Sequence, residues 1–255
     1  DNIDLNAAAA KGITVVNTPV ANVASVIEHI VTFILSLSKQ LVRLDTAVKG
    51  GTFSEQGSSL PGLAQRLNYL PQEVRGKTLG LIGLGKIGRG VAEICGQALG
   101  MKVMAYDPYL AGDVGPNIEI KDTLESLLKE ADYVSLQVPL NCQTLGIIGY
   151  DELLLMKDSA FLINVSRGQV VDEEGFMRAL KEKRIAGAAL DVYWHEPTPE
   201  DHELLTLDNV LLTPHVAGVT GEALERISVD AAQGVTDVLM GKKPKYSCTP
   251  SSCAQ

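Results

Sequence analysis

The stretch Leu-Gly-Leu-Ile-Gly-Leu-Gly-Lys-Ile-Gly, residues 79–88, contains the pattern Gly-x-Gly-x-x-Gly between an apolar run and a helical pattern. In a strand–turn–helix unit, the first glycine permits a tight turn and the second lets the backbone approach a pyrophosphate. The third lets the helix pack closely against the strand. These roles fall to Gly83, Gly85 and Gly88, and the N–H groups at the start of the helix would face the anion. Alone the pattern is a weak signal, because glycine turns also occur without a ligand.

An acidic residue at the end of the next apolar run strengthens this interpretation. Asp107 lies 19 residues beyond Gly88 (107 − 88) and directly follows the run 102–106. A carboxylate in this place accepts hydrogen bonds from an adenosine ribose and repels a 2′-phosphate. The sequence therefore predicts a dinucleotide site, with NAD favoured over NADP.

From residue 77 onward, short apolar runs alternate with helical patterns. Continuous apolar runs of strand length indicate strands buried on both faces, and their alternation with helices predicts a parallel sheet covered on both sides. The expected fold class is α/β, a doubly wound parallel sheet of the Rossmann type. The predicted strands are residues 79–83, 102–106, 133–138, 160–165, 188–192 and 210–213, and the predicted helices include residues 86–99, 123–129 and 172–183.

Three further segments lie outside this alternation. Residues 22–45 predict one long, mostly apolar helix, in which Ser25 and Glu28 are spaced as a capping box. Residues 49–76 are rich in Gly, Ser, Gln and Pro and predict a long irregular arm. Over residues 222–240 apolar side chains recur at helical spacing, which predicts one more amphipathic helix.

Charge, hydropathy and cysteine spacing exclude several classes of protein. A net charge of -9 and a pI near 5.0 argue against a nucleic-acid or anionic-membrane surface. The longest apolar run, residues 30–37, is much shorter than the roughly 20 residues of a membrane span. The four cysteines form no disulfide framework and no zinc-like spacing with histidine. We therefore expect a reducing compartment, the cytoplasm, and no metal site, with Cys95 as a core residue.

Polar side chains follow the last three predicted strands. Arg167 comes after the fourth strand, Glu196 after the fifth and His215 after the sixth. Ligands of doubly wound sheets bind outside the carboxyl ends of the strands. The three side chains are therefore expected at one ligand-binding edge.

Each of the three also has a structural interpretation: Arg167 as a surface ion-pair partner, Glu196 as a solvated loop charge, and His215 as a core histidine. Together on the ligand edge they favour hydride transfer. Arg167 can hold a carboxylate through a bidentate fork. His215 can exchange a hydroxyl proton near neutral pH while Glu196 orients it. Of the other histidines, His29 is predicted to be structural and His202 to be solvent-exposed.

Four motifs now stand in a recognisable order: Gly-Leu-Gly-Lys-Ile-Gly, Asn-Val-Ser-Arg-Gly, Asp-Val-Tyr-Trp-His-Glu-Pro and Thr-Pro-His-Val-Ala-Gly. From Asp1 to about Lys243 the chain resembles the D-isomer-specific 2-hydroxyacid dehydrogenases, with their phosphoglycerate dehydrogenase branch looking nearest. The resemblance implies Arg167 as the ligand of the substrate carboxylate and carbonyl, His215 as acid and base, and Glu196 as its partner. It also implies cofactor contacts from Lys86, Ile87, Asp107, Val138, Val165, Asp191 and Gly218.

The resemblance further implies two domains, the second being a flavodoxin-like substrate domain built from both ends of the chain. Residues 1–20 are then a remnant of the substrate domain, and residues 21–218 are the NAD-binding domain. Residues 219–245 form a helix that returns to the substrate domain, and residues 246–255 form a tail. The polar residues 241–255 are expected to fray. Most of the N-terminal substrate region is expected to be absent, so this chain alone is predicted to bind NADH weakly without measurable turnover.

The leading hypothesis is an NAD-dependent oxidoreductase that interconverts a D-2-hydroxy acid and its 2-keto acid. Two alternatives stay open: a non-catalytic NAD(H)-sensing protein, as among the family's corepressors, and an inactive fragment. The apolar residues 27–37 and the arm behind them, together with the resemblance, predict a homodimer. The expected partners are thus a small 2-hydroxy or 2-keto acid and a second copy of the chain, with no nucleic acid and no membrane.

Overall fold

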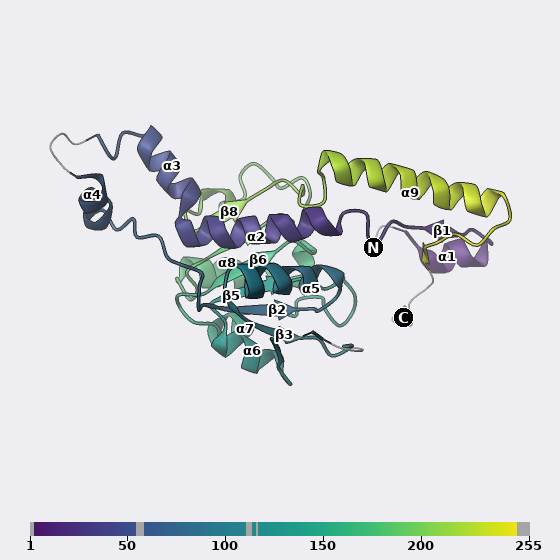
Figure 1. The fold of residues 1–255 in the computed structure, drawn as a ribbon, viewed down its shortest axis with the longest axis horizontal. Coiled ribbons are helices and arrows are strands. Elements are labelled where there is room, and N and C mark those ends of the chain that lie inside the picture. Colours follow the sequence, from purple (N-terminus) through teal and green to yellow (C-terminus); the bar gives the residue numbers. More distant parts are fainter. Residues whose placement is uncertain (1–2, 55–58, 111–113, 116, 249–255) are drawn as a thin grey trace.

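A seven-stranded parallel sheet forms the centre of the molecule (Figure 1). The computed structural model describes residues 3–54, 59–110, 114–115 and 117–248. The strand order is β4-β3-β2-β5-β6-β7-β8, and every neighbouring pair is parallel. The strands are β2 (Thr78–Ile82), β3 (Lys102–Tyr106), β4 (Ile118–Ile120), β5 (Tyr133–Leu136), β6 (Phe161–Asn164), β7 (Gly187–Leu190) and β8 (Val210–Leu212).

The α/β doubly wound class is confirmed, and all six predicted strands are present. β5 ends at Leu136, two residues before the predicted end, because the chain there turns into a loop. β4 is not among the predicted strands. It is a three-residue edge strand that contains Glu119 and pairs only with β3, so it carries no continuous apolar run. The strand order reverses between β2 and β5, which makes the crevice at their carboxyl ends the topological switch point.

Helices cover both faces of the sheet (Figure 1). Side chains from α2 (Val23–Lys39) and α5 (Lys86–Glu93) pack in one core, and those from α6 (Leu124–Glu130), α7 (Tyr150–Leu155) and α8 (Glu173–Lys181) pack in the other. α5 continues as a π-helical turn, Ile94–Ala98, so the predicted helix 86–99 is present but changes its winding. Cys95 is fully buried in this turn, as predicted, and burial raises the pKa of its thiol to about 12.

The glycine-rich turn between β2 and α5 is closely packed on itself. Gly83 has a φ of +93°, in the region that side chains rarely adopt. A Cβ atom added to Gly88 would lie only 2.4 Å from the carbonyl oxygen of Gly83. A Cβ atom added to Gly85, in contrast, would meet no atom within 4 Å. Two of the glycines are therefore required by the fold itself, while Gly85 leaves open space above the helix.

The long helix predicted for residues 22–45 is in fact two helices. α2 ends at Lys39, Gln40 adopts a left-handed conformation with φ 50°, and α3 (Leu41–Lys49) continues at an angle of 57°. The break coincides with contacts to the arm, because Ser38 Oγ and Lys39 Nζ both donate to the carbonyl of Gln72. A periodicity argument cannot detect a bend that depends on a segment more than thirty residues away.

Two smaller predictions for this region also need correction. The capping box at Ser25 is wrong, because the N-cap of α2 is Asn22 and the Ser25 hydroxyl donates instead to the carbonyl of Ala217. The arm 49–76 is not wholly irregular, since Ser59 caps a short helix, α4 (Leu60–Arg66). Residues 55–58 of the arm lie outside the described part of the chain.

The two ends of the chain meet at one side of the molecule (Figure 1). β1 (Val15–Val16) pairs antiparallel with β9 (Ser247–Cys248). Along the chain, β1 follows α1 (Leu5–Ala10), and β9 follows the long helix α9 (Gly221–Leu239). The expectation that residues 246–255 form a fraying tail is therefore wrong for Ser247 and Cys248, because β1 supplies hydrogen-bond partners from the other end of the chain. Residues 249–255 lie outside the described part.

Among the described residues, no single helix is long and apolar enough to cross a membrane. The bent pair α2 and α3 passes such a test of length and composition when the two helices are taken together. Ile30, Phe33 and Ile34 of α2 are buried in the core against the sheet. Their apolar character is accounted for by that packing.

The packing of the glycine-rich turn generates a stability prediction. Gly88→Ala is expected to lower the free energy of unfolding by about 1–3 kcal/mol, because the new methyl group overpacks the contact with the Gly83 carbonyl. Gly85→Ala is the matched control and is expected to change it by less than about 0.5 kcal/mol, since its Cβ enters open space. Urea denaturation measures both variants, and equal losses would contradict this account of the turn.

Candidate active site

The candidate cofactor groove starts at the turn between β2 and α5. Gly85 and Lys86 are exposed at the start of α5, where backbone N–H groups have no partner within the helix. Asp107 directly follows β3 and lies against this turn, since its Oδ2 accepts a hydrogen bond of 2.9 Å from the Leu84 amide. Its Oδ1 accepts from the Tyr109 amide at 2.9 Å. The predicted ribose ligand is thus next to the predicted phosphate turn.

A cavity of about 590 Å³ continues from this turn to the ends of β5, β6 and β7. Among the residues that line it are five of the predicted cofactor residues and two of the predicted catalytic ones: Ile87, Val138, Val165, Asp191, Gly218, Arg167 and His215. Gly83 and Gly88 lie buried in the turn itself. Glu196 does not line the cavity but contacts it through His215.

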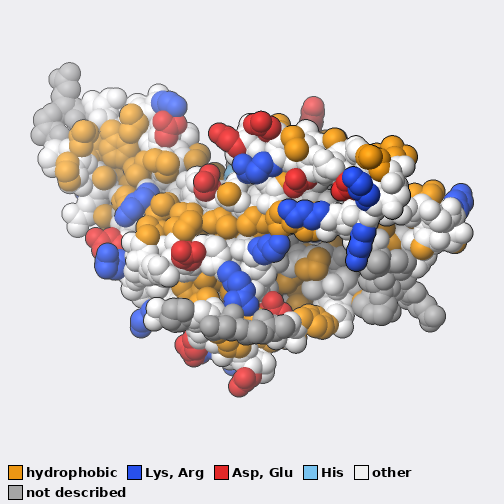
Figure 2. All heavy atoms as spheres, turned by 45° about the vertical axis from the view of Figure 1, so that its right-hand side comes forward, with side chains coloured by type: hydrophobic (Ala, Val, Ile, Leu, Met, Phe, Trp, Pro, Cys, Tyr) orange, Lys and Arg blue, Asp and Glu red, His pale blue; other side chains and the backbone are white. Residues whose placement is uncertain are grey.

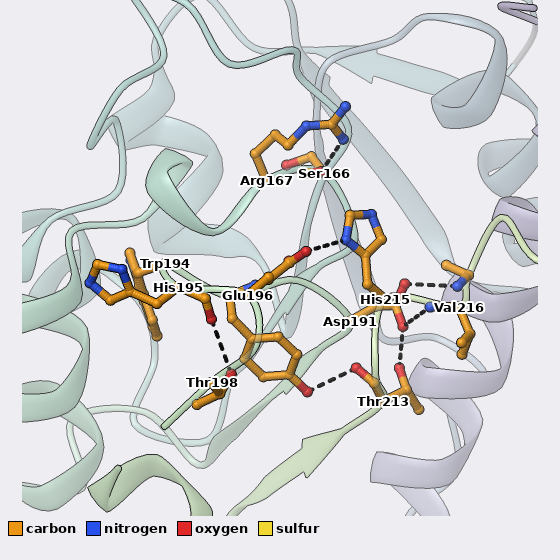
Figure 3. Close-up of polar contacts among 12 residues, drawn as sticks. Ser166, Arg167, Asp191, Trp194, His195, Glu196, Thr198, Thr213, His215 and Val216 are labelled. Carbon is orange, nitrogen blue, oxygen red and sulfur yellow. Dashed lines mark hydrogen bonds and ion pairs between the residues drawn. The ribbon is translucent and has the colours of Figure 1, made fainter. Parts of the chain in front are cut away.

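The predicted pair of Glu196 and His215 is formed. His215 Nδ1 lies 2.6 Å from Glu196 Oε2, and both side chains are partly exposed (Figure 3). A proton on Nδ1 directed at the carboxylate leaves Nε2 available to a ligand in the cavity. Arg167 lies on the same side of the sheet edge, with Nη1 donating to the Ser166 carbonyl at 2.7 Å. The strand ends therefore bring the three predicted catalytic residues together, as the sequence indicated.

The surroundings keep the Glu196 carboxyl ionised. Its partial burial alone would raise its pKa, but the hydrogen bond with His215 and the amide of Tyr193 lower it. The charges of His215 and Arg167 act in the same direction, and the net shift is downward from the ordinary glutamate value. The carboxylate consequently persists to more acid pH than that of an isolated glutamate and can accept the proton on Nδ1.

Asp191, at the end of β7, holds the turn that carries His215. It is fully buried, and its carboxylate accepts hydrogen bonds from Thr213 Oγ1 (2.5 Å), the Val216 amide (2.9 Å) and the Ala217 amide (2.7 Å). His215 sits within this turn with φ 56°, a left-handed conformation that is uncommon for a residue other than glycine. Asp191 lines the cavity, yet its hydrogen bonds to the turn make it a positioning residue as well.

Sequence reasoning missed Thr213 and Tyr193, which also position the site. Tyr193 donates from its hydroxyl to the Thr213 carbonyl and from its amide to Glu196 Oε1. Burial, with the charges of Asp191 and Glu196, raises the pKa of the Tyr193 phenol to about 12, so it remains a donor. Both residues lie within the motifs quoted above, Tyr193 in the third and Thr213 in the fourth. The available signal for their roles was that each is a polar side chain at a strand end.

Of the remaining histidines, His29 contacts Thr213 Oγ1 through Nε2 at 3.0 Å, in agreement with a structural role. The prediction for His202 is wrong. Its side chain is only 18% exposed, its Nε2 lies 2.7 Å from Glu173 and its Nδ1 accepts from the Leu204 amide. The acidic loop in which it stands folds back onto α8, which composition alone could not reveal. Within the described ranges, no group of three or more His, Cys, Asp or Glu side chains is arranged to hold a metal ion.

Comparison with known proteins agrees with this geometry. A family model, D-isomer specific 2-hydroxyacid dehydrogenase, NAD binding domain, matches residues 31–217. The D-3-phosphoglycerate dehydrogenase of Archaeoglobus fulgidus is 38% identical over 242 residues, which are 94% of this chain and 44% of that protein. The glyoxylate reductase of Thermofilum pendens is 39% identical over 249 residues, which are 96% of this chain and 70% of that protein.

A solved structure shows the same architecture. D-lactate dehydrogenase from Lactobacillus jensenii, crystallised with NAD+, has a TM-score of 0.82 at 30% identity, with 97% of this chain and 75% of that chain covered. The chain thus spans less than half the length of the Archaeoglobus relative and about three quarters of the lactobacillus structure. By sequence and by fold, the chain belongs to the D-isomer-specific 2-hydroxyacid dehydrogenase family, and residues 31–217 match the NAD-binding domain of that family.

Proposed function

We propose that the complete protein is an NAD-dependent oxidoreductase that interconverts a D-2-hydroxy acid and its 2-keto acid. The observation that carries this proposal is the Glu196–His215 pair, at 2.6 Å, beside a cavity that Arg167 also lines at the carboxyl edge of the sheet. The names of the relatives support it, since they are reductases and dehydrogenases. Those names do not favour the alternative of a non-catalytic NAD(H) sensor.

The residues present fit a bound NAD. The open space at Gly85 accommodates a pyrophosphate close to the backbone, Lys86 is exposed at the same helix start, and Asp107 lies next to the turn. Ile87, Val138 and Val165 give the cavity apolar walls, and Gly218 and Asp191 also line it. When bound, the nicotinamide would exchange a hydride with C2 of the substrate.

The chain's own groups would orient the substrate and move its proton. Arg167 presents a planar fork of N–H donors that can hold the substrate carboxylate and polarise its 2-keto oxygen. In the oxidative direction, His215 Nε2 takes the proton of the 2-hydroxyl group, and in the reductive direction it returns that proton to the 2-keto oxygen. Glu196 keeps the imidazole in one orientation through Nδ1 and stabilises its protonated form.

We also propose that the chain ends belong to a second, substrate-binding domain, with residues 21–218 forming the NAD-binding domain. β1 pairs with β9, and Val16 packs against Gly234 of α9, so the two ends form one unit. The solvent side of α9 exposes Leu224, Val235 and Leu239, an apolar face available to the rest of that domain.

Limited proteolysis tests this division of the chain. Early cleavage is expected next to residues 20 and 219, because few contacts of the end unit cross to the sheet. The fragment 21–218 is expected to survive and to retain NADH binding. Cleavage that begins inside residues 77–218 would contradict the proposed boundaries.

A second copy of the chain is the other partner that we propose. The apolar residues of α2 that first suggested a dimer are largely buried against the sheet. Leu41, Val42 and Val48 of α3 and Leu60 of α4 are each more than half exposed, and Figure 2 shows apolar side chains gathered at this end of the molecule. Next to them a cavity of about 870 Å³ opens between the end of α2, α3 and the amino-terminal ends of β6, β7 and β8.

The complete protein is accordingly expected to sediment as a dimer at micromolar concentration, since association would remove this apolar surface from water. Val42→Glu with Val48→Glu is expected to shift the population toward monomer. Leu154→Glu, at an exposed apolar residue of α7 on the opposite face of the sheet from α2, is the control and should leave the dimer intact. Sedimentation of the unaltered protein as monomer only would contradict the proposal.

The proposed chemistry is tested by His215→Ala in the complete protein. The variant is expected to lower kcat by about 10² to 10⁴-fold, the usual contribution of general acid–base catalysis. Its NADH affinity should stay nearly unchanged, because the imidazole does not hold the nucleotide. NADH oxidation with a panel of 2-keto acids measures turnover, and His195→Ala, at an exposed histidine directed away from His215 (Figure 3), is the control. Near-normal turnover by His215→Ala would contradict the proposed role of His215 as acid and base.

The choice of nucleotide depends on Asp107. NADH is expected to bind more tightly than NADPH, because the Asp107 carboxylate repels a 2′-phosphate while its remaining lone pairs can accept from ribose hydroxyls. Asp107→Ala should reduce the difference in affinity between NADH and NADPH. Asp208→Ala, which removes an exposed charge at the opposite edge of the sheet, should leave that difference unchanged. Fluorescence titration measures both nucleotides, and equal affinity in the unaltered protein would overturn the assignment.

A further inference from the structure

The turn that carries His215 is also held from behind, by helix α2. Ser25 Oγ donates to the Ala217 carbonyl at 2.6 Å, and His29 Nε2 lies 3.0 Å from Thr213 Oγ1. Ser25 and His29 are four residues apart (29 − 25), so they lie on one face of the helix, one turn from each other. That face therefore contacts both ends of the segment 213–217.

The hydrogen-bond directions in this contact can be assigned. The Thr213 hydroxyl has a single proton, and it donates that proton to Asp191 Oδ1. The Thr213 oxygen is then an acceptor toward His29, so His29 Nε2 carries a proton and donates it. Burial lowers the pKa of His29, against the attraction of Asp191, which favours a neutral ring with one donor. The order of donation is His29 to Thr213 to Asp191.

This chain of hydrogen bonds ends on the carboxylate that shapes the turn. Asp191 accepts from Thr213 and from the amides of Val216 and Ala217, on either side of His215 in the sequence. The left-handed conformation of His215 is costly for a residue with a side chain and persists only if its surroundings impose it. The donor from His29 fixes the Thr213 hydroxyl in the orientation that serves Asp191.

We propose that His29 and Ser25 are positioning residues of the active site, which hold the segment 213–217 so that His215 meets Glu196. The inference rests on the proposed function of His215. Without the Nε2–H donor, the Thr213 hydroxyl can rotate and the turn can relax toward negative φ. The imidazole would then leave the position in which its Nδ1 lies 2.6 Å from Glu196.

Substitutions at His29 separate this role from packing. His29→Leu removes the donor and keeps an apolar side chain against Phe33, whose ring centroid lies 4.4 Å from that of His29. His29→Gln keeps an N–H donor at comparable reach and should restore the contact. Ile30→Val is the matched control, because it removes a buried methyl group from the next residue of α2 without touching the turn.

Amide hydrogen exchange gives a readout that does not depend on catalysis. In the complete protein, His29→Leu is expected to speed exchange of the Val216 and Ala217 amides, whose acceptor is Asp191, while amides in the centre of the sheet keep their protection. His29→Gln should keep that protection. Ile30→Val should lower the midpoint of unfolding without selectively exposing the turn.

Steady-state kinetics gives the second readout. His29→Leu is expected to lower kcat by about 10- to 100-fold, the usual effect of misplacing a catalytic group, with little change in the dissociation constant of NADH. His29→Gln should recover most of the loss, and Ser25→Ala should act in the same direction as His29→Leu. If His29→Leu leaves both exchange and kcat unchanged, or if Ile30→Val reproduces both effects, the proposal is overturned.

The two readouts keep this inference apart from the proposed function. If the unaltered complete protein reduces no 2-keto acid, the proposed function fails, while the exchange measurement still decides whether His29 holds the turn. If the unaltered protein is active and His29→Leu changes neither exchange nor kcat, the inference alone fails.

Discussion

The candidate site depends on the hydrogen bonds between the buried Asp191 carboxylate and the turn after β8. Buried carboxylates are tolerated only where hydrogen bonds replace water, and here Thr213, Val216 and Ala217 supply them. Because the Thr213 hydroxyl precedes His215 and the amides of Val216 and Ala217 follow it, the same bonds determine the conformation of the turn. A histidine at φ 56° is the consequence. The backbone conformation at His215 is thus set by the Asp191 carboxylate, while Glu196 contacts the imidazole itself.

The sheet topology explains how distant residues reach this place. In a parallel sheet all carboxyl ends lie at one edge, so β6, β7 and β8 deliver Arg167, Glu196 and His215 to neighbouring positions. The reversal of strand order between β2 and β5 opens the crevice beside the glycine-rich turn. Gly83 and Gly88 let α5 approach that turn, while the open space at Gly85 faces the groove. The candidate cofactor groove and the Glu196–His215 pair therefore share one edge.

Helix α2 connects regions that the sequence separates widely. Its first turns hold the segment 213–217 through Ser25 and His29, and its last turn holds the arm through Ser38 and Lys39. Between these contacts its apolar side chains are buried against the sheet. One helix therefore contacts both the arm and the turn that carries His215.

The sequence by itself determined the fold class, the glycine-rich turn and the three residues of the candidate site. These features depend on local patterns: apolar runs of strand length, glycines at fixed spacing, and polar residues directly after strands. Only the tertiary structure decided where α2 ends, that His202 contacts Glu173, and that Ser247 and Cys248 form a strand, because each depends on partners far away in the chain. The same holds for His29, Thr213 and Tyr193, whose importance lies in contacts across the fold. Periodicity and spacing describe neighbours along the chain, whereas a hydrogen bond between residues 184 positions apart is settled by packing.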